Sequence, residues 1–194
     1  MSMPVFAAAG LRLSWGAVLA YWAWSARGAK PTEQIEPRAL RLVAYWLPLA
    51  GAFALLGPGE WFGHGILREP FVPHSLPVYG LGTASCLAGA VIAVWSRWLL
   101  GSNWSSVVAL KQDHELVEAG PYRYVRHPIY SGLLLLFVGN ALIVGDWRGL
   151  LAVAIVAASF WRKLRVEEAW LAQRFGERYL DYMRRTRALV PGLL

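Results

Sequence analysis

The chain has 194 residues, of which 57% are hydrophobic and 16% are charged. Soluble domains usually carry about 25% charged residues, so this balance excludes an ordinary soluble domain and points to a membrane protein. The formal net charge is +7. However, the basic residues flank apolar runs and form no open patch with interleaved aromatic side chains, which argues against nucleic-acid binding. With Cys86 as its one cysteine, the sequence holds neither a disulfide framework nor a cysteine-based zinc site.

Five apolar stretches predict an all-α integral membrane protein with about five transmembrane helices. In chain order they cover residues 5–24, 40–56, 76–100, 129–144 and 150–161. The first is long enough to cross a bilayer, which takes about 20 residues. It is not preceded by a basic segment, so we expect a helix that stays in the membrane and not a cleaved signal. Arg12 interrupts it and should face protein or reach toward the interface.

The fourth and fifth stretches are short, and only the polar, glycine-bounded residues 145–149 separate them. This pattern predicts a tight helical hairpin. The fifth stretch is long enough for a span only if its helix continues into Arg162 and beyond. Residues 165–185 then mix polar side chains with spaced apolar ones, which predicts a cytosolic amphipathic helix that is broken near Gly176.

Lys and Arg are distributed unevenly between the connections. Residues 25–41, residues 96–128 and the tail after Trp161 hold most of them, whereas the remaining two connections carry only Arg68 and Arg148. The positive-inside rule therefore predicts five crossings, with the N-terminus outside and the C-terminus inside. The sequence suits a prokaryotic inner membrane, and it would also suit the endoplasmic reticulum.

Polar side chains concentrate in residues 114–130 and in residues 162–168, both on the predicted cytosolic side. The hairpin between these clusters returns the chain to the same side, so both can contribute to one site. Pro128 suits the first position of a helix, because it needs no N–H group there. Arg126 and His127 would then precede that helix at the membrane surface. Taken singly, Arg126 also fits a phosphate-facing interface residue, and His127 a simple helix cap.

The segment Gly120-Pro-Tyr-Arg-Tyr-Val-Arg-His-Pro-Ile-Tyr130 resembles the isoprenylcysteine carboxyl methyltransferase family and its bacterial and archaeal relatives. The preceding residues 114–117 and the downstream Glu167-Glu168 fit the same pattern, as do residues 103–105 and residues 175–182. The resemblance covers about residues 101–191. The N-terminal half matches only in being helical and apolar.

This resemblance implies a methyltransferase that uses S-adenosyl-L-methionine without a soluble Rossmann fold. The cofactor would enter from the cytosol, and a lipophilic small molecule or a prenylated cysteine would enter from the bilayer lipid. Residues 1–100 would supply transmembrane helices and residues 101–194 the cofactor-binding and catalytic region, within a single domain and without a metal. The residues implied to bind the cofactor are His114, Glu115, Leu116, Val117, Gly120, Tyr122, Arg126, His127, Pro128, Ile129, Tyr130 and Glu167.

The sequence departs from the family pattern at one position. The resemblance implies an arginine one turn before the first glutamate, where it would meet the substrate carboxylate. Lys163 stands at that position, four residues before Glu167, and Arg162 and Arg165 flank it. Lysine lacks the bidentate fork with which arginine binds a carboxylate. We therefore expect Arg162 or Arg165 to act with Glu167 as catalytic residues, unless the acceptor is not a prenylcysteine carboxylate.

Three functions remain open at this stage: methyl transfer to a carboxylate or to another lipid group, reduction with NADPH, and a scaffold without enzymatic activity. A carboxylate acceptor is already ionised at neutral pH and needs proximity and a dry site more than a base. A phenolic or amine lipid would need a base, for which His127 or Glu167 are the candidates. An NADPH-dependent enzyme of the sterol-reductase type should carry further basic residues and more helices. If the protein is a scaffold whose basic tail binds anionic lipid, His127→Ala and Glu167→Ala should leave its function unchanged.

Two further features have simple structural interpretations. Gly80-Leu-Gly82 lies inside an apolar run with no preceding strand, so it predicts close helix packing and not a dinucleotide loop. Asn140 lies in the fourth stretch, where it is expected to form a hydrogen bond with another helix.

Overall fold

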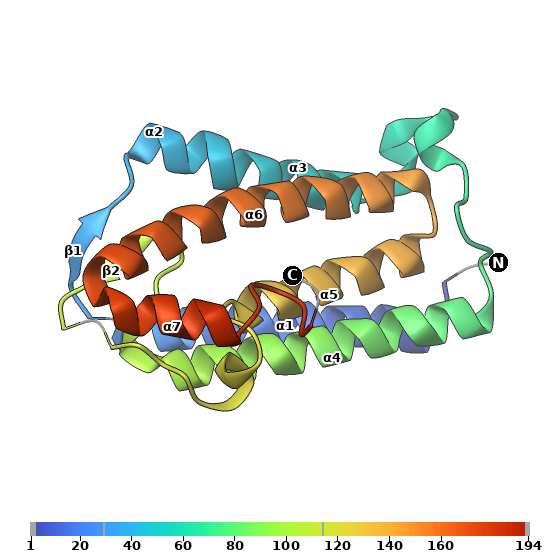
Figure 1. The fold of residues 1–194 in the computed structure, drawn as a ribbon. Coiled ribbons are helices and arrows are strands. Elements are labelled where there is room, and N and C mark those ends of the chain that lie inside the picture. The colour runs from blue at the N-terminus through green and yellow to red at the C-terminus, as the bar shows by residue number, and fades with distance from the viewer. Residues whose placement is uncertain (1–2, 29, 114, 193–194) are drawn as a thin grey trace.

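The computed structural model describes residues 3–28, 30–113 and 115–192, and it is mostly helical. The α-helices are α1 (Val5–Ser25), α2 (Arg38–Arg41), α3 (Leu47–Leu55), α4 (Leu76–Leu100), α5 (Pro128–Val144), α6 (Trp147–Phe175) and α7 (Glu177–Arg185). Short helical turns are η1 (Ala26–Gly28), η2 (Leu42–Trp46), η3 (Gly59–Phe62), η4 (Ile66–Arg68), η5 (Gly101–Asn103) and η6 (Gly120–Arg123). The long helices run along one common direction, and the strands β1 (Thr32–Ile35) and β2 (Ala109–Lys111) lie at one end of them (Figure 1).

Three stretches of the described residues are long and apolar enough to cross a membrane, namely Val5–Gly28, Arg38–Leu55 and Leu76–Asn103. They coincide with the first three predicted spans and confirm that these stretches form helices of sufficient length. Helix α5 is apolar but shorter, and α6 continues well past Arg162, as the fifth span requires. Whether α5 and α6 cross the bilayer stays a prediction. Exposed side chains such as Leu13 and Leu81, at 67% and 60%, give the helices an apolar outer surface, which suits contact with lipid.

Helices α4 and α5 touch through glycines. A Cβ atom at Gly89 would lie 2.5 Å from the carbonyl oxygen of Gly132, and one at Gly139 would lie 2.5 Å from the carbonyl oxygen of Gly82. Small residues of this kind let two membrane helices approach backbone to backbone. A Cβ atom at Gly80 would have no other atom within 4 Å. Of the Gly80-Leu-Gly82 pair, only Gly82 therefore confirms the predicted close helix packing.

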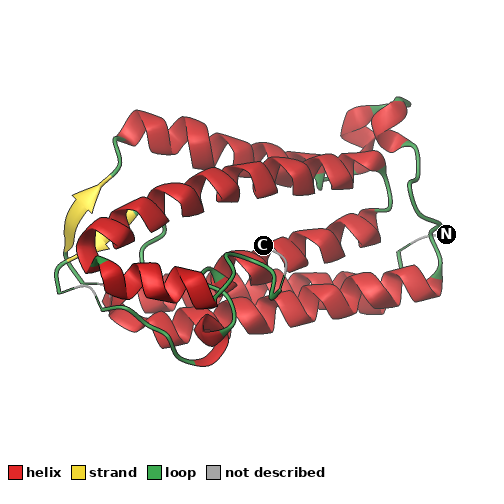
Figure 2. Cartoon of the chain, viewed as in Figure 1, coloured by secondary structure: helices red, strands yellow, loops and turns green. Residues whose placement is uncertain are grey.

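The expectation of an all-α chain is wrong at the end of the bundle where β1 and β2 lie. These strands pair antiparallel, with Thr32 opposite Lys111 and Ile35 opposite Ala109, and Figure 2 shows them in yellow. The sequence of β1, Thr-Glu-Gln-Ile, is exposed along its length and polar at its first three positions. It has no alternating apolar pattern, which is the main signal for a strand. The pairing forms because two linkers meet at the same end of the helices.

The end of α6 turns the chain back over the bundle. Gly176 has a φ of 55°, in the region that favours glycine, and it separates α6 from α7 as predicted. Beyond α7, the backbone of residues 186–189 lies along residues 124–127. The amide of Arg126 donates to the carbonyl of Arg187 at 2.8 Å, and the amide of His127 donates to that of Ala188 at 3.0 Å. The tail thereby covers the start of α5.

Candidate functional site

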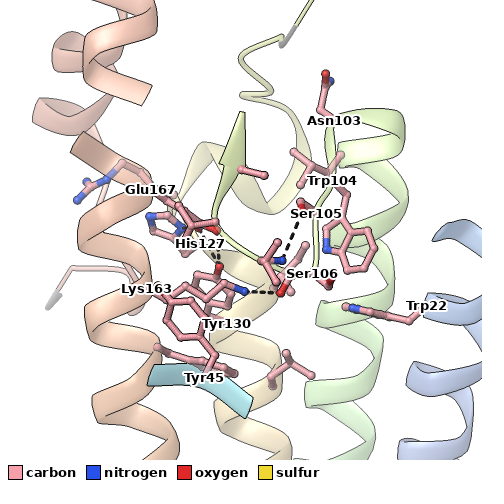
Figure 3. Close-up of a pocket in the computed structure, with 18 of the residues that line it drawn as sticks. Trp22, Tyr45, Asn103, Trp104, Ser105, Ser106, His127, Tyr130, Lys163 and Glu167 are labelled. Atoms are coloured by element: carbon pink, nitrogen blue, oxygen red, sulfur yellow. Dashed lines mark hydrogen bonds and ion pairs between the residues drawn. The ribbon is translucent and has the colours of Figure 1, made fainter. Parts of the chain in front are cut away.

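A cavity of about 370 Å³ lies inside the helical bundle, on the side of β2. Its volume is within the range of small-molecule sites. One part of its wall is apolar and comes from α1, η2, α3 and α5. The other part carries most of the polar groups, which are contributed by Asn103, Ser106, Glu115, Arg126, His127, Tyr130, Lys163 and Glu167. An apolar compartment therefore adjoins a small group of charged and hydrogen-bonding side chains. Figure 3 labels several of these polar side chains, among them His127, Lys163 and Glu167.

The ring of His127 lies between two neighbouring carboxylates of α6. Its Nε2 atom is 3.3 Å from Oε1 of Glu168, and its Nδ1 atom is 3.7 Å from Oε2 of Glu167. His127 occupies the N-cap position of α5, with Pro128 next to it, but its side chain makes no cap hydrogen bond. His127 is therefore a helix cap by the position of its backbone, but its imidazole ring does not cap the helix and contacts α6 instead.

Glu167 is held from α5. The hydroxyl of Tyr130 lies 2.8 Å from both of its carboxylate oxygens. The Tyr130 ring is stacked between His127 and Phe160, with centroids 5.4 and 4.9 Å away. The glutamate side chain keeps 21% of its surface exposed. It is therefore fixed in direction while it still faces the cavity, as Figure 3 shows.

Glu168, in contrast, belongs to a buried network of hydrogen bonds and ion pairs that links α6, the start of α5 and the C-terminal tail. Arg126 donates from Nε to Glu168 at 2.6 Å, and from Nη1 to the carbonyls of Thr186 at 2.6 Å and Met183 at 3.3 Å. Burial alone would raise the pKa of Glu168, but the hydrogen bonds and charges of His127 and Arg126 outweigh it and lower that pKa. Arg126 does not face lipid headgroups, because its side chain is only 10% exposed.

Lys163 places a buried ammonium group at the cavity wall. Its Nζ atom donates to the carbonyl of Ser106 at 2.9 Å and lies above the rings of Tyr130 and Tyr45, at 5.1 and 5.6 Å from their centroids. The residue is 7% exposed. Ammonium carries three donors, and the carbonyl of Ser106 is its one hydrogen-bond acceptor among the described residues. Two donors are thus free for a ligand in the cavity.

The two arginines that were expected to meet a substrate carboxylate lie elsewhere. Arg162 donates to the hydroxyl of Tyr45 and, at 3.2 Å, to Glu36, and Tyr45 donates to the same glutamate. Glu36 is 4% exposed and the Arg162 side chain is 38% exposed, so this network is a partly buried link between α6 and the segment before α2. Arg165 is exposed. Neither arginine contributes to the cavity wall, as far as the structure describes it.

Most of the residues implied to bind the cofactor do line this cavity. They are Glu115, Leu116, Val117, Tyr122, Arg126, His127, Ile129, Tyr130 and Glu167. Gly120 and Pro128 shape the backbone instead, since Gly120 takes a φ of 59° and Pro128 begins α5. His114 lies outside the described residues.

Other cavity residues had no place in the sequence-based assignment. Tyr179 of α7 is 1% exposed and lines the cavity, and its hydroxyl has no hydrogen-bond partner among the described residues. Burial raises the pKa of Tyr179, so its hydroxyl stays protonated and can donate. Tyr45 lines the wall from η2, a π-helical turn. The spaced apolar residues of the tail were a signal for Tyr179, whereas no sequence signal marks Tyr45.

Asn140 is an expectation that the structure contradicts. Its side chain is buried at 6% exposure, but its Oδ1 atom has no hydrogen-bond partner among the described residues. The predicted bond to another helix is therefore absent from this part of the chain. Asn140 instead lines a second pocket, whose wall also includes Arg12 and Tyr79.

Comparison with known proteins gives consistent matches. The sequence model of the phospholipid methyltransferase family matches residues 78–178. The protein-S-isoprenylcysteine O-methyltransferase of Schizosaccharomyces pombe is 32% identical over 158 residues, which cover 76% of this chain and 67% of that protein. Form B of the enzyme from Arabidopsis thaliana is 27% identical over 117 residues, which are 59% of each chain. The chain thus spans about three fifths to two thirds of these relatives.

A solved structure shares the fold. The eukaryotic intramembrane Ras methyltransferase, isoprenylcysteine carboxyl methyltransferase, matches with a TM-score of 0.52 and 24% identity, over 82% of this chain and 55% of that one. At this identity the match establishes the arrangement of helices.

Proposed function

Because the chain belongs to the phospholipid methyltransferase family of membrane enzymes, alongside isoprenylcysteine O-methyltransferases, we propose that it methylates a lipophilic carboxylate. The methyl donor is S-adenosyl-L-methionine, and the acceptor is the carboxylate of an isoprenylcysteine-like molecule. One observation carries this proposal: a buried ammonium, that of Lys163, and a fixed carboxylate, that of Glu167, face one cavity whose remaining wall is largely apolar.

The polar wall fits the proposed donor. S-adenosyl-L-methionine supplies a methyl group on a positively charged sulfonium, next to an ammonium and a carboxylate. Glu167 offers the negative charge that these cationic groups require, and Tyr130 keeps it oriented. The unpartnered hydroxyl of Tyr179 is a buried donor for a polar ligand. Residues 115–117 complete this side with one carboxylate and two apolar side chains, which suits a nucleoside.

Lys163 is the group that we assign to the acceptor carboxylate. Its two free donors face the cavity, and its ammonium is out of contact with water. Charge attraction is stronger in such a place than at a surface. Arg162 would first have to leave Glu36 and Tyr45, and Arg165 would have to turn inward. A positioned, ionised carboxylate needs no general base, so His127 is a positioning residue between the two glutamates in this scheme.

The buried ammonium also bears on the alternatives. A lipid amine would arrive mostly protonated at neutral pH, and Lys163 would repel it. A phenol would need a base within reach, and Glu167 is already engaged by Tyr130. The carboxylate acceptor is therefore the best match to the charges of this site.

We place this site on the cytosolic face, with the N-terminus outside. The distribution of Lys and Arg supports this orientation. A cysteine introduced at His64 should react with an impermeant thiol reagent from outside, and one introduced at Arg184 only after the membrane is opened. The reverse pattern would contradict the orientation. Native Cys86 is buried and serves as the unreactive background.

The central experiment separates the donor from the acceptor. Calorimetric titration with S-adenosylhomocysteine should show saturable binding that Glu167→Ala weakens, whereas Glu177→Ala, at an exposed site on α7, leaves it unchanged. Methyl transfer to N-acetyl-S-farnesylcysteine should then be observed, and the matching carboxamide should accept no methyl group. Well-folded protein that does not bind S-adenosylhomocysteine would refute the donor, and activity on the carboxamide would refute the carboxylate.

A further inference from the structure

Three aromatic rings close the apolar end of the cavity. Trp15 of α1 contacts Phe53 of α3 and Phe137 of α5, with centroids 4.8 and 5.1 Å away, and Phe53 lies 5.4 Å from Phe137. Each ring touches the other two, so the three together form a barrier across the space between α1, α3 and α5. We call these three residues the aromatic floor. All of them line the cavity.

The aromatic floor is separated from the polar groups by the same distance along α5 and along α6. On α5, Phe137 follows Tyr130 by seven residues, and on α6, Val156 at the floor precedes Lys163 by seven. Seven residues of helix rise about 10 Å. Val156 and Phe137 belong to the same buried cluster. Two independent helices thus give the apolar compartment the same height of about two turns.

The walls between these two levels are apolar. They are formed by Val18 and Leu19 of α1, Leu49 of α3, Leu133 of α5 and Phe160 of α6. Helix α1 packs on α4, whereas α3 packs on α6. The compartment is the space between these two packed pairs, and the rings of the floor bridge it. It therefore accommodates an apolar chain that enters with its polar end toward Lys163.

We propose that the aromatic floor sets the length of the apolar tail that the enzyme accepts. This inference rests on the proposed function, because it takes the carboxylate end to be held by Lys163. A tail that reaches the floor fills the compartment. A longer tail must displace a packed ring or leave its last unit bent against the wall. A single extra methylene in such a pocket already changes selectivity by about tenfold or more.

Trp15 is the best position at which to test the floor. Its indole Nε1 atom is buried and has no hydrogen-bond partner among the described residues, so its removal leaves no acceptor unpaired. Phe137 is 1% exposed and lies in the core, where truncation costs about 3–5 kcal/mol and threatens the fold. Phe53, 40% exposed, provides a second and independent variant from another helix.

The experiment compares N-acetylcysteine thioethers that carry geranyl, farnesyl or geranylgeranyl tails. Trp15→Ala and Phe53→Ala should each raise the ratio of kcat/KM for the longest tail over the best wild-type tail by about tenfold. Leu49→Trp, one turn above Phe53, should shift the preference toward the shortest tail. Trp46→Ala removes an aromatic ring from the same cavity wall, two turns above the floor, and should leave the preference unchanged.

Two measurements, turnover and binding, distinguish a failure of the aromatic-floor proposal from a failure of the proposed function. If wild-type protein methylates none of the three thioethers, the proposed acceptor is refuted. Calorimetry of the same thioethers, with S-adenosylhomocysteine present, then ranks their affinities without turnover. An unchanged ranking by tail length in Trp15→Ala and Phe53→Ala would overturn the floor whether or not the wild type is active. A shift toward the longer tail in both variants, but not in Trp46→Ala, supports it.

Discussion

The hydroxyl of Tyr130 lies 2.8 Å from both carboxylate oxygens of Glu167. This contact joins the first turn of α5 to the part of α6 that follows its apolar half. It also gives the cavity a carboxylate of fixed direction. A group fixed in advance costs less ordering when a ligand binds.

Tyr130→Phe should therefore weaken the binding of S-adenosylhomocysteine without unfolding the protein. The hydrogen bond to a charged group is worth about 1.5–3 kcal/mol, so we expect the dissociation constant to rise by about tenfold or more. Calorimetry measures this change. Tyr124→Phe removes a hydroxyl from a side chain that is 67% exposed, and it should bind as the wild type does. Equal affinities for both variants would contradict the role of Tyr130.

Lys163→Met should raise the KM for the carboxylate acceptor by about tenfold or more, because it removes a charged hydrogen bond to the substrate. The affinity for S-adenosylhomocysteine should change much less, since Glu167 stays in place. Arg165→Met, at an exposed position, serves as the matched control and should have wild-type kinetics. If Arg165→Met were the variant with the high KM and Lys163→Met were normal, the assignment of the acceptor site would be reversed.

Glu168→Gln should remove a stabilising contribution that depends on pH. The pKa of Glu168 is lowered in the folded protein from its ordinary value of 4.5. The carboxylate therefore contributes its full stabilisation above pH 4.5, and this contribution is lost as the pH falls through the lowered pKa. In thermal unfolding in detergent at neutral pH, the Tm of the wild type should be higher than that of Glu168→Gln, and this difference is the gap to be followed. The gap should close in acid, whereas Glu177→Gln should show no such gap.

Gly132→Ala should destabilise the fold through the contact between α4 and α5. Its Cβ atom would lie 2.7 Å from the carbonyl oxygen of Gly89 and from the amide of Ala93. Overpacking of this kind costs about 1–3 kcal/mol. Gly80→Ala adds the same methyl group to α4 where no atom lies within 4 Å. Its Tm should equal or exceed that of wild type, and an equal loss in both variants would contradict the backbone contact.

The sequence predicted the parts of this molecule that rest on composition and periodicity. The apolar runs located α1, α4 and α5, and Gly176 marked the end of α6, because these features depend on local preferences. The segment from Gly120 to Tyr130 and the residues that fit the same pattern led to part of the polar cavity wall, including His127, Tyr130 and Glu167. The sheet was missed, since its pairing depends on two linkers that are far apart in the chain.

The sequence pattern could not determine which of the neighbouring basic residues on α6 faces the cavity. Arg162, Lys163 and Arg165 lie on one helix within four residues, and only the rotation of α6 determines which of them faces the cavity. That rotation follows from the packing of α6 on α3 and α5, which sequence spacing does not specify. Arg162 is held by the buried Glu36, which lies far from it in the sequence. The sequence pattern around Arg162 therefore did not indicate this ion pair.

The two-stranded sheet connects the two parts of the cavity wall to each other. Strand β1 connects α1 to α2, and thereby the two helical arms that border the apolar compartment, while β2 leads directly into residues 115–117 of the polar wall. Ladder hydrogen bonds tie these segments together. If a ligand in the apolar compartment displaced β1, the pairing with β2 would transmit the movement toward residues 115–117. Any such coupling between two ligands would be reciprocal, so each ligand would change the affinity for the other by the same factor.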